Sequence, residues 1–277
     1  SVGKDKTEGA AVKRLIVIAL AIWLYPASSL GQGLVHLEAG LKAEIRGDLD
    51  TAIARYSLAI EAGDLSTGVL SVAFSNRGNA YRAKSQYDRA IGDYNVAIQM
   101  NPYNASAFNG RGSAYTHKGQ YDRAIEDYDT AVRLSPKNAS FFKNRARAHF
   151  YLRKFAEAQP DMFRALELNP DDAFAAIWLY LARARAGQDG RGELDKNAGR
   201  LKLETWPGPV VKLYLGKATD ASVLSAAKDA DPKKDKEQHC EAYFYLGQHA
   251  LLRGDRGEAI RLVKAAIDTG VTNFVEY

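Results

Sequence analysis

The sequence is almost devoid of cysteine. Cys240 is the single cysteine among 277 residues, so no disulfide can form within the chain, and packing alone must hold the fold. The net charge is also small: the chain has 38 Lys and Arg residues and 33 Asp and Glu residues, which gives +5. With 46% apolar and 26% charged residues, the chain is too hydrophobic for a disordered protein and too polar for a multi-pass membrane protein.

Long apolar runs are missing from the N-terminal segment as well. Residues 15–25 form an apolar run of 11 residues, which is too short to span a bilayer as a helix. Two basic residues precede the run, and a proline and small residues follow it, which is the order of a secretory signal peptide. We therefore expect residues 1–31 to be a cleaved signal peptide, with cleavage after Ser29 or Gly31, and the mature protein to be exported and periplasmic. The alternative is a cytoplasmic or inner-membrane-anchored assembly scaffold that keeps this segment uncleaved.

The position of the single cysteine indicates whether the N-terminal segment can carry a lipid anchor. Because Cys240 is far from the N-terminal segment, no lipobox is present there, and we do not expect a lipid anchor. Residues 1–31 hold four basic and two acidic side chains, so their removal lowers the net charge to +3. So weak a positive charge argues against nucleic acid as the ligand.

A gapless 34-residue repeat dominates the middle of the sequence. Residues 71–104, 105–138 and 139–172 align over their full length, with small residues at repeat positions 8, 20 and 27 and proline at position 32. This is the tetratricopeptide (TPR) pattern, in which each repeat forms two antiparallel helices, A and B. The small residues permit the close crossing of the two helices, large residues at positions 4, 11, 17 and 24 surround it, and the proline ends helix B. The predicted fold class is therefore all-α: a TPR α-solenoid, a right-handed superhelix of antiparallel helix pairs.

Divergent segments flank the three regular repeats. Residues 33–66 match as a divergent first repeat, and residues 240–273 match as a C-terminal repeat. Residues 173–239 do not follow the 34-residue repeat pattern and are expected to form irregular helical pairs. Within this block the sequence predicts helices over residues 173–186, 209–215 and 220–228, and a solvated linker or helix entry over residues 232–238.

Two charged positions of the repeat change together. Position 7 is arginine and position 23 is aspartate in all three regular repeats, and the flanking repeats have neither. The pairs are Arg77 with Asp93, Arg111 with Asp127, and Arg145 with Asp161. We interpret them as structural ion pairs rather than ligand-binding groups. Pro160, inside the expected helix B of residues 139–172, predicts a local distortion of that helix.

No group of residues in the sequence matches a catalytic, metal-binding or phosphate-binding motif. We therefore expect neither an enzyme nor a cofactor, metal or small-molecule substrate; a cell-envelope hydrolase stays open only as a hypothesis that activity of the purified chain would revive. The expected binding site is instead the concave groove lined by the A helices, which can present amides and cations to an extended peptide. The candidate residues are Ser75, Asn76, Asn79, Arg82, Asn109, Ser113, Thr116, His117, Lys143, Asn144 and Arg147.

Several segments outside the repeats carry a family resemblance. These are residues 171–182 around Trp178, residues 212–216, residues 243–255 and residues 272–276. With the repeats, they resemble the NlpI-type bacterial envelope lipoproteins over roughly residues 33–277. The resemblance implies a homodimeric adaptor that brings cell-wall hydrolases to a processing protease. Proteins or peptides are thus the expected partners of a non-catalytic exported scaffold.

Overall fold

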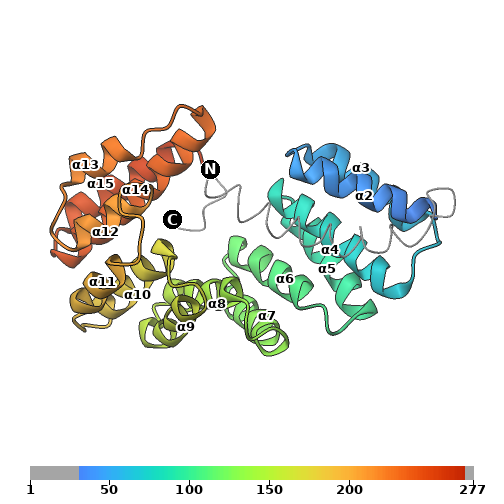
Figure 1. Cartoon of the computed structure of the whole chain (residues 1–277), viewed down its shortest axis with the longest axis horizontal. Helices are drawn as coiled ribbons and strands as arrows, with labels where there is room; N and C mark the ends of the chain where they lie inside the picture. Colours follow the sequence, from blue (N-terminus) through green and yellow to red (C-terminus); the bar gives the residue numbers. More distant parts are fainter. Residues whose placement is uncertain (1–30, 272–277) are drawn as a thin grey trace. The chain divides into compact units, whose positions relative to one another are not determined.

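A computed structural model describes residues 31–271, and every regular element in this part of the chain is an α-helix (Figure 1). The predicted all-α fold of antiparallel helix pairs is confirmed. The expected signal segment, except its last residue, lies outside the described residues, as do residues 272 and 273 of the predicted C-terminal repeat.

The helices fall into two compact units that divide between Leu134 and Ser135. In unit 1 the helices are α2 (Gln32–Ile45), α3 (Leu49–Glu61), α4 (Thr67–Ala83), α5 (Tyr87–Met100), α6 (Ala105–His117) and α7 (Tyr121–Leu134). In unit 2 they are α8 (Ala139–Tyr151), α9 (Phe155–Leu168), α10 (Ala173–Arg185), α11 (Arg191–Ala198), α12 (Gly208–Tyr214), α13 (Asp220–Ala226), α14 (Pro232–Leu252) and α15 (Arg256–Asp268). In unit 1, helices α2, α4 and α6 are the A helices, and α3, α5 and α7 are the B helices.

Short polar residues and prolines set the helix ends. Asn104, Asn138 and Asp172 share repeat position 34, and each side chain accepts a hydrogen bond from a backbone N–H of the following helix A. Such a cap satisfies a donor that the first turn leaves unpaired. The B helices end at Met100, Leu134 and Leu168, in each case two residues before the proline of position 32. The predicted role of that proline is confirmed.

A tyrosine pressed against a glycine marks the crossing of helices A and B. The tyrosines at position 24 of the unit 1 repeats are fully or almost fully buried, and each ring covers the glycine at position 8 of its own repeat. A Cβ atom added to that glycine would come within 2.5–2.9 Å of the ring in the three pairs, which are Gly40 with Tyr56, Gly78 with Tyr94 and Gly112 with Tyr128. The ring of Tyr94 also lies against Gly110 of the next repeat, where an added Cβ would approach to 2.5 Å. Only glycine leaves room for these rings.

The arginine of position 7 binds the aspartate of position 23 through two parallel hydrogen bonds. For Arg111, the Nε and Nη2 atoms lie 2.8 and 2.6 Å from the Asp127 carboxylate oxygens. The same geometry joins Arg77 to Asp93 and Arg145 to Asp161, so the predicted ion pairs are confirmed. In unit 1 the remaining Nη1 atom also bonds to position 25 of the preceding repeat, Ser57 for Arg77 and Asn95 for Arg111. Each of these two arginines therefore fixes its own helix pair and ties it to its neighbour.

A second contact between successive repeats joins position 13 of one to position 17 of the repeat before it. In unit 1 the His117 ring stacks on Tyr87, with centroids 4.9 Å apart and planes inclined by 8°. In unit 2 the corresponding pair is a cation over a ring, because the Arg185 guanidinium lies 5.1 Å from the centroid of Phe155. The contact thus recurs with different chemistry in the two units.

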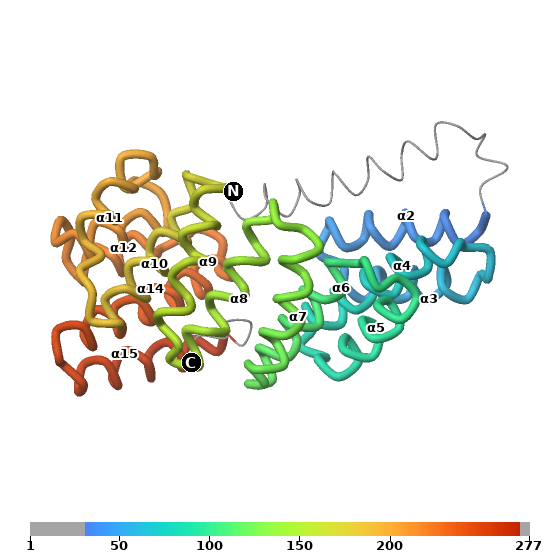
Figure 2. The backbone as a smooth tube through the Cα atoms, turned by 90° about the horizontal axis from the view of Figure 1, so that it is seen from below, coloured from blue at the N-terminus to red at the C-terminus, as the bar shows by residue number. Residues whose placement is uncertain are grey.

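The irregular block differs in part from its prediction. Helix α11 was not expected. Residues 232–238, expected to be either a solvated linker or a helix entry, are a helix entry, because they form the first turns of the 21-residue helix α14. Asp231 caps α14 and Pro232 occupies its first turn, where a missing N–H costs nothing. Pro160 lies inside α9 without delaying its start, since α9 begins at repeat position 17, like α5 and α7. Figure 2 shows α10 beside α9 in unit 2, and α10 also contacts α14.

The Gly–Tyr packing predicts opposite effects for two glycine substitutions in unit 1. Gly110→Ala should lower the free energy of unfolding by about 1–3 kcal/mol, because the buried Tyr94 ring cannot move away from the added methyl group. Gly92→Ala is the matched control, since Gly92 lies inside α5 with nothing within 4 Å of an added Cβ. It should raise the free energy of unfolding by up to about 1 kcal/mol through helix propensity alone. Urea unfolding followed by circular dichroism measures both, and equal shifts would contradict the packing argument.

The Arg–Asp pair predicts a pH-dependent loss of stability. Burial raises the pKa of Asp127, and the hydrogen bonds from Arg111 oppose that rise. In an Arg111→Met variant the opposition is gone, so the pKa of Asp127 in the folded chain stands further above its value in the unfolded chain. Such a group stabilises the fold below the unfolded pKa and loses that effect as the pH rises through the folded pKa. The variant should therefore lose roughly 2–4 kcal/mol at neutral pH and less near pH 5.

The control for this prediction is the double variant Arg111→Met/Asp127→Asn, which has no carboxylate to titrate at this position. Urea unfolding of the wild type and both variants between about pH 5 and pH 8 makes the comparison. A stability loss in the single variant that stays constant over this range would show that Asp127 is not the responsible group.

Candidate functional site

The structure distributes the predicted groove residues over three A helices in two units. Unit 1 holds Ser75, Asn76, Asn79 and Arg82 on α4 and Asn109, Ser113, Thr116 and His117 on α6, whereas unit 2 holds Lys143, Asn144 and Arg147 on α8. Helices α4 and α6 are neighbours within unit 1. The unit 1 residues are therefore the set that the fold brings to adjacent helices.

Three of the unit 1 residues are buried. Ser75, Asn76 and Thr116 are 3%, 2% and 7% exposed. The Thr116 hydroxyl donates to the carbonyl oxygen of Gly112 and lies 3.1 Å from the Tyr128 hydroxyl. In this state these side chains contribute to helix packing, and little of their surface is open to a ligand.

Asn79 is half-buried and has a fixed orientation. The Tyr94 hydroxyl donates to Asn79 Oδ1 over 2.7 Å. This bond occupies the amide oxygen and turns the Nδ2 group, with its two N–H donors, away from the tyrosine. Because an added Cβ at Gly110 would lie 2.7 Å from the same hydroxyl, the Tyr94 hydroxyl lies between α4 and α6. The buried Tyr94 therefore fixes the position of the Asn79 Nδ2 donors on helix α4.

Arg82 lies three residues after Asn79, on the same side of α4. Its side chain is half-buried, and no carboxylate of residues 31–271 forms an ion pair with it. On α6, Asn109 and Ser113 are half-buried and four residues apart. We call Asn79, Arg82, Asn109 and Ser113 the A-helix face of unit 1. This face is rich in hydrogen-bond donors and has no acidic member.

The α8 residues have structural partners within unit 2. Lys143 Nζ lies 2.6 Å from a carboxylate oxygen of Asp172, which is buried and also caps α10. The Arg147 guanidinium lies 5.5 Å from the centroid of Trp178, and its Nη2 atom is 3.3 Å from the Tyr151 hydroxyl. Lys143 and Arg147 therefore help to join α8 to α10.

An aromatic cluster in unit 2 was not predicted from the repeat pattern. Trp178 of α10 contacts Phe150 of α8 edge to face and stacks on Phe244 of α14, with centroids 5.0 and 5.6 Å apart. The Tyr214 hydroxyl donates to the backbone carbonyl of Tyr245. These contacts hold the irregular helices around α10.

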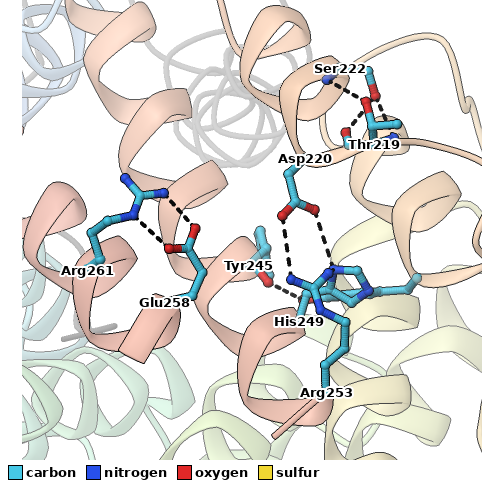
Figure 3. Close-up of polar contacts among 9 residues, drawn as sticks. Thr219, Asp220, Ser222, Tyr245, His249, Arg253, Glu258 and Arg261 are labelled. Carbon is cyan, nitrogen blue, oxygen red and sulfur yellow. Dashed lines mark hydrogen bonds and ion pairs between the residues drawn. The ribbon is translucent and has the colours of Figure 1, made fainter. Parts of the chain in front are cut away.

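A polar cluster joins α13 to α14 (Figure 3). The Asp220 carboxylate oxygens lie 3.5 Å from His249 Nδ1 and 3.7 Å from Arg253 Nη2. Burial and the charge of Arg253 lower the pKa of His249, so the imidazole stays neutral near pH 7. The neutral His249 Nδ1 accepts a hydrogen bond from Arg253 Nη1 over 2.9 Å, and the Asp220 carboxylate joins α13 to this pair through its charge.

Within residues 31–271, no three His, Cys, Asp or Glu side chains gather in a way that could hold a metal ion. Over the same residues, no helix combines the length and the apolar character needed to cross a bilayer.

Comparison with known proteins agrees with the repeat architecture. Residues 75–139 match the family model described as tetratricopeptide repeat. A tetratricopeptide repeat protein from Parabacteroides merdae is 18% identical and has a TM-score of 0.57, with 87% of this chain and 94% of that chain covered. A MamA protein from Desulfovibrio magneticus is 15% identical and has a TM-score of 0.54, with 61% and 94% covered. These two likenesses show the fold.

A third solved structure is more similar in sequence over a shorter stretch. The first TPR domain of Spaghetti (RPAP3), bound to the HSP90 peptide SRMEEVD, is 30% identical and has a TM-score of 0.42, with 43% of this chain and 94% of that domain covered. Tetratricopeptide repeats mediate protein–protein interaction, and the fold is typically a non-catalytic scaffold. The repeat register, the Gly–Tyr crossings and the family match together identify residues 75–139 as tetratricopeptide repeats, and the described helices have the tetratricopeptide fold.

Proposed function

We propose that this chain is a non-catalytic adaptor that binds an extended segment of a partner protein on the A-helix face of unit 1. The observation that carries the proposal is the bond from Tyr94 to Asn79 Oδ1, which leaves the Asn79 Nδ2 donors for a ligand. An extended peptide presents backbone carbonyl oxygens, which are acceptors, so donors held at fixed positions match it.

Arg82 adds charge to this recognition. Its guanidinium has five N–H donors and no carboxylate partner among the described residues, so an acceptor on the ligand would meet an unneutralised cation. Because the tyrosine that orients Asn79 is also the residue that fills the helix crossing, the donor is held without a large entropy cost on binding.

The cellular setting is part of the same proposal. We propose an exported, periplasmic protein, processed after Ser29 or Gly31, that acts as a homodimer and scaffolds cell-wall hydrolases and a processing protease. The signal-like segment and the resemblance to NlpI-type proteins support this. Since α2 begins at Gln32, cleavage at either position would leave all the described helices intact.

The binding proposal predicts that Asn79→Asp weakens peptide binding. The substitution keeps an acceptor for the Tyr94 hydroxyl but replaces the two outward N–H donors with a carboxylate oxygen, which repels peptide carbonyls. We expect the Kd of peptides selected from a random display library to rise by about ten-fold or more, as measured by fluorescence anisotropy. Arg82→Gln should weaken binding as well.

The matched controls lie on the B helices of the same unit. Gln99→Glu makes the same amide-to-carboxylate change on the exposed side of α5, and Arg133→Gln removes an exposed arginine from α7. Neither control should change the Kd. If Asn79→Asp and Arg82→Gln bind as the wild type does, the A-helix face of unit 1 is not the binding site.

The export proposal predicts a shortened protein in its native host. Mass spectrometry of the isolated protein should give a mature N-terminus at Leu30 or Gln32. Recovery of the protein with residues 1–31 intact would support the anchored or cytoplasmic scaffold instead.

A further inference from the structure

Two arginines of unit 2 interact near the start of α9, and neither pairs with a carboxylate of the described residues. Arg153 occupies the turn between α8 and α9, and Arg185 is the last residue of α10. The Arg185 guanidinium lies over the Phe155 ring, only two residues beyond Arg153, and its Nη1 atom donates to Gln248 Oε1 of α14 over 3.0 Å. Within residues 31–271, neither arginine forms an ion pair.

The energetics of Arg185 are consistent with a missing anion. Burial lowers the pKa of Arg185, and the positive charge of Arg153 lowers it further. No carboxylate acts in the opposite direction, whereas hydrogen bonding to Asp127 raises the pKa of Arg111. The fold therefore holds two like charges together at a cost that an anion would offset.

Arg153 also lies at a strained backbone position. Its φ angle is +60°, in the left-handed region that favours glycine. The corresponding turn residue of the other helix pairs is glycine at Gly47, Gly119, Gly187 and Gly254, with φ between 70° and 82°, and serine at Ser85, with a φ of 58°. An arginine at this position therefore costs stability that glycine would not.

We propose that Arg153, Arg185 and Gln248 form a second binding site, in unit 2, for the carboxylates of an acidic segment of a protein partner. The donors are the Arg153 guanidinium, the N–H groups of Arg185 that do not bond to Gln248, and the Gln248 Nε2 group, whose orientation the Arg185 bond fixes. Planar guanidinium groups match planar carboxylates through paired hydrogen bonds. The Phe155 ring supports Arg185 from below and keeps its charge partly desolvated, which strengthens such a bond.

An acidic protein segment fits this site better than nucleic acid does. Nucleic acid recognition uses a broad basic surface that neutralises many phosphates, and the whole chain has a net charge of only +5. This second site rests on the proposed adaptor role, but none of its residues belongs to the A-helix face of unit 1. The two proposals can therefore fail independently.

The test is an anisotropy titration of the full chain with a fluorescein-labelled peptide of alternating glutamate and glycine. Arg153→Gly and Arg185→Gln should each raise the Kd of this peptide by about five-fold or more. Arg164→Gln is the control, because it removes an exposed arginine of the same unit that pairs only with Glu167 three residues away. The control should stay within about two-fold of the wild type, and a glutamine–glycine peptide should not bind.

Urea unfolding of the same variants separates binding from folding. Arg153→Gly should weaken binding of the acidic peptide. The same variant should nevertheless unfold at a higher urea concentration than the wild type, because it relieves both the backbone strain and the charge repulsion. Unchanged affinity in both variants, equal binding of the glutamine peptide, or binding of a short oligodeoxythymidylate in place of the acidic peptide would overturn the proposal. Asn79→Asp should leave the acidic peptide unaffected, so a failure in unit 1 would not be mistaken for a failure here.

Discussion

The packing of a tyrosine ring on a bare glycine backbone is the constraint on which unit 1 depends. In each of its three helix pairs, the ring at position 24 fills the crossing that the glycine at position 8 leaves open. The same ring carries its hydroxyl to the A-helix side, where it bonds to Glu44, Asn79 or Thr116. One residue therefore sets both the spacing of the helices and the orientation of polar groups on the surface they present. Structure and recognition are coupled through it.

The charged and stacked contacts build on this crossing and connect one repeat to the next. Arg77 and Arg111 each bind an aspartate of their own repeat and a polar side chain of the preceding one. Positions 13 and 17 add a ring or cation contact between repeats. Nearest-neighbour contacts of this kind explain how a repeat fold gains stability without long-range closure. Arg153 and Arg185, like Arg82, form no ion pair with a carboxylate of the described residues.

The sequence predicted the parts of the structure that repeat, and missed those that depend on single contacts. Helix pairs, the proline stops and the Arg–Asp pairs recur at fixed positions, so three aligned copies reveal them. The burial of Asn76 and the pairing of Lys143 with Asp172 occur once, and a list of groove positions cannot show them. In unit 2, the contact of Trp178 with Phe244 joins residues far apart in the chain, and no periodicity predicts it. Arg153 occupies a turn position where several other helix pairs have glycine. The significance of this substitution is clear only from the positive φ angle that the structure gives.

The measurement that tests the central claim most directly is an NMR titration of the full chain with a library-selected peptide, observed at the side-chain amide of Asn79 and the Nε–H of Arg82. If the A-helix face binds the peptide, both signals shift together and saturate with the Kd of the complex, while the side-chain amide of Gln99 on α5 does not move. Saturating shifts confined to the B helices, with the Asn79 and Arg82 signals unchanged, would contradict the account.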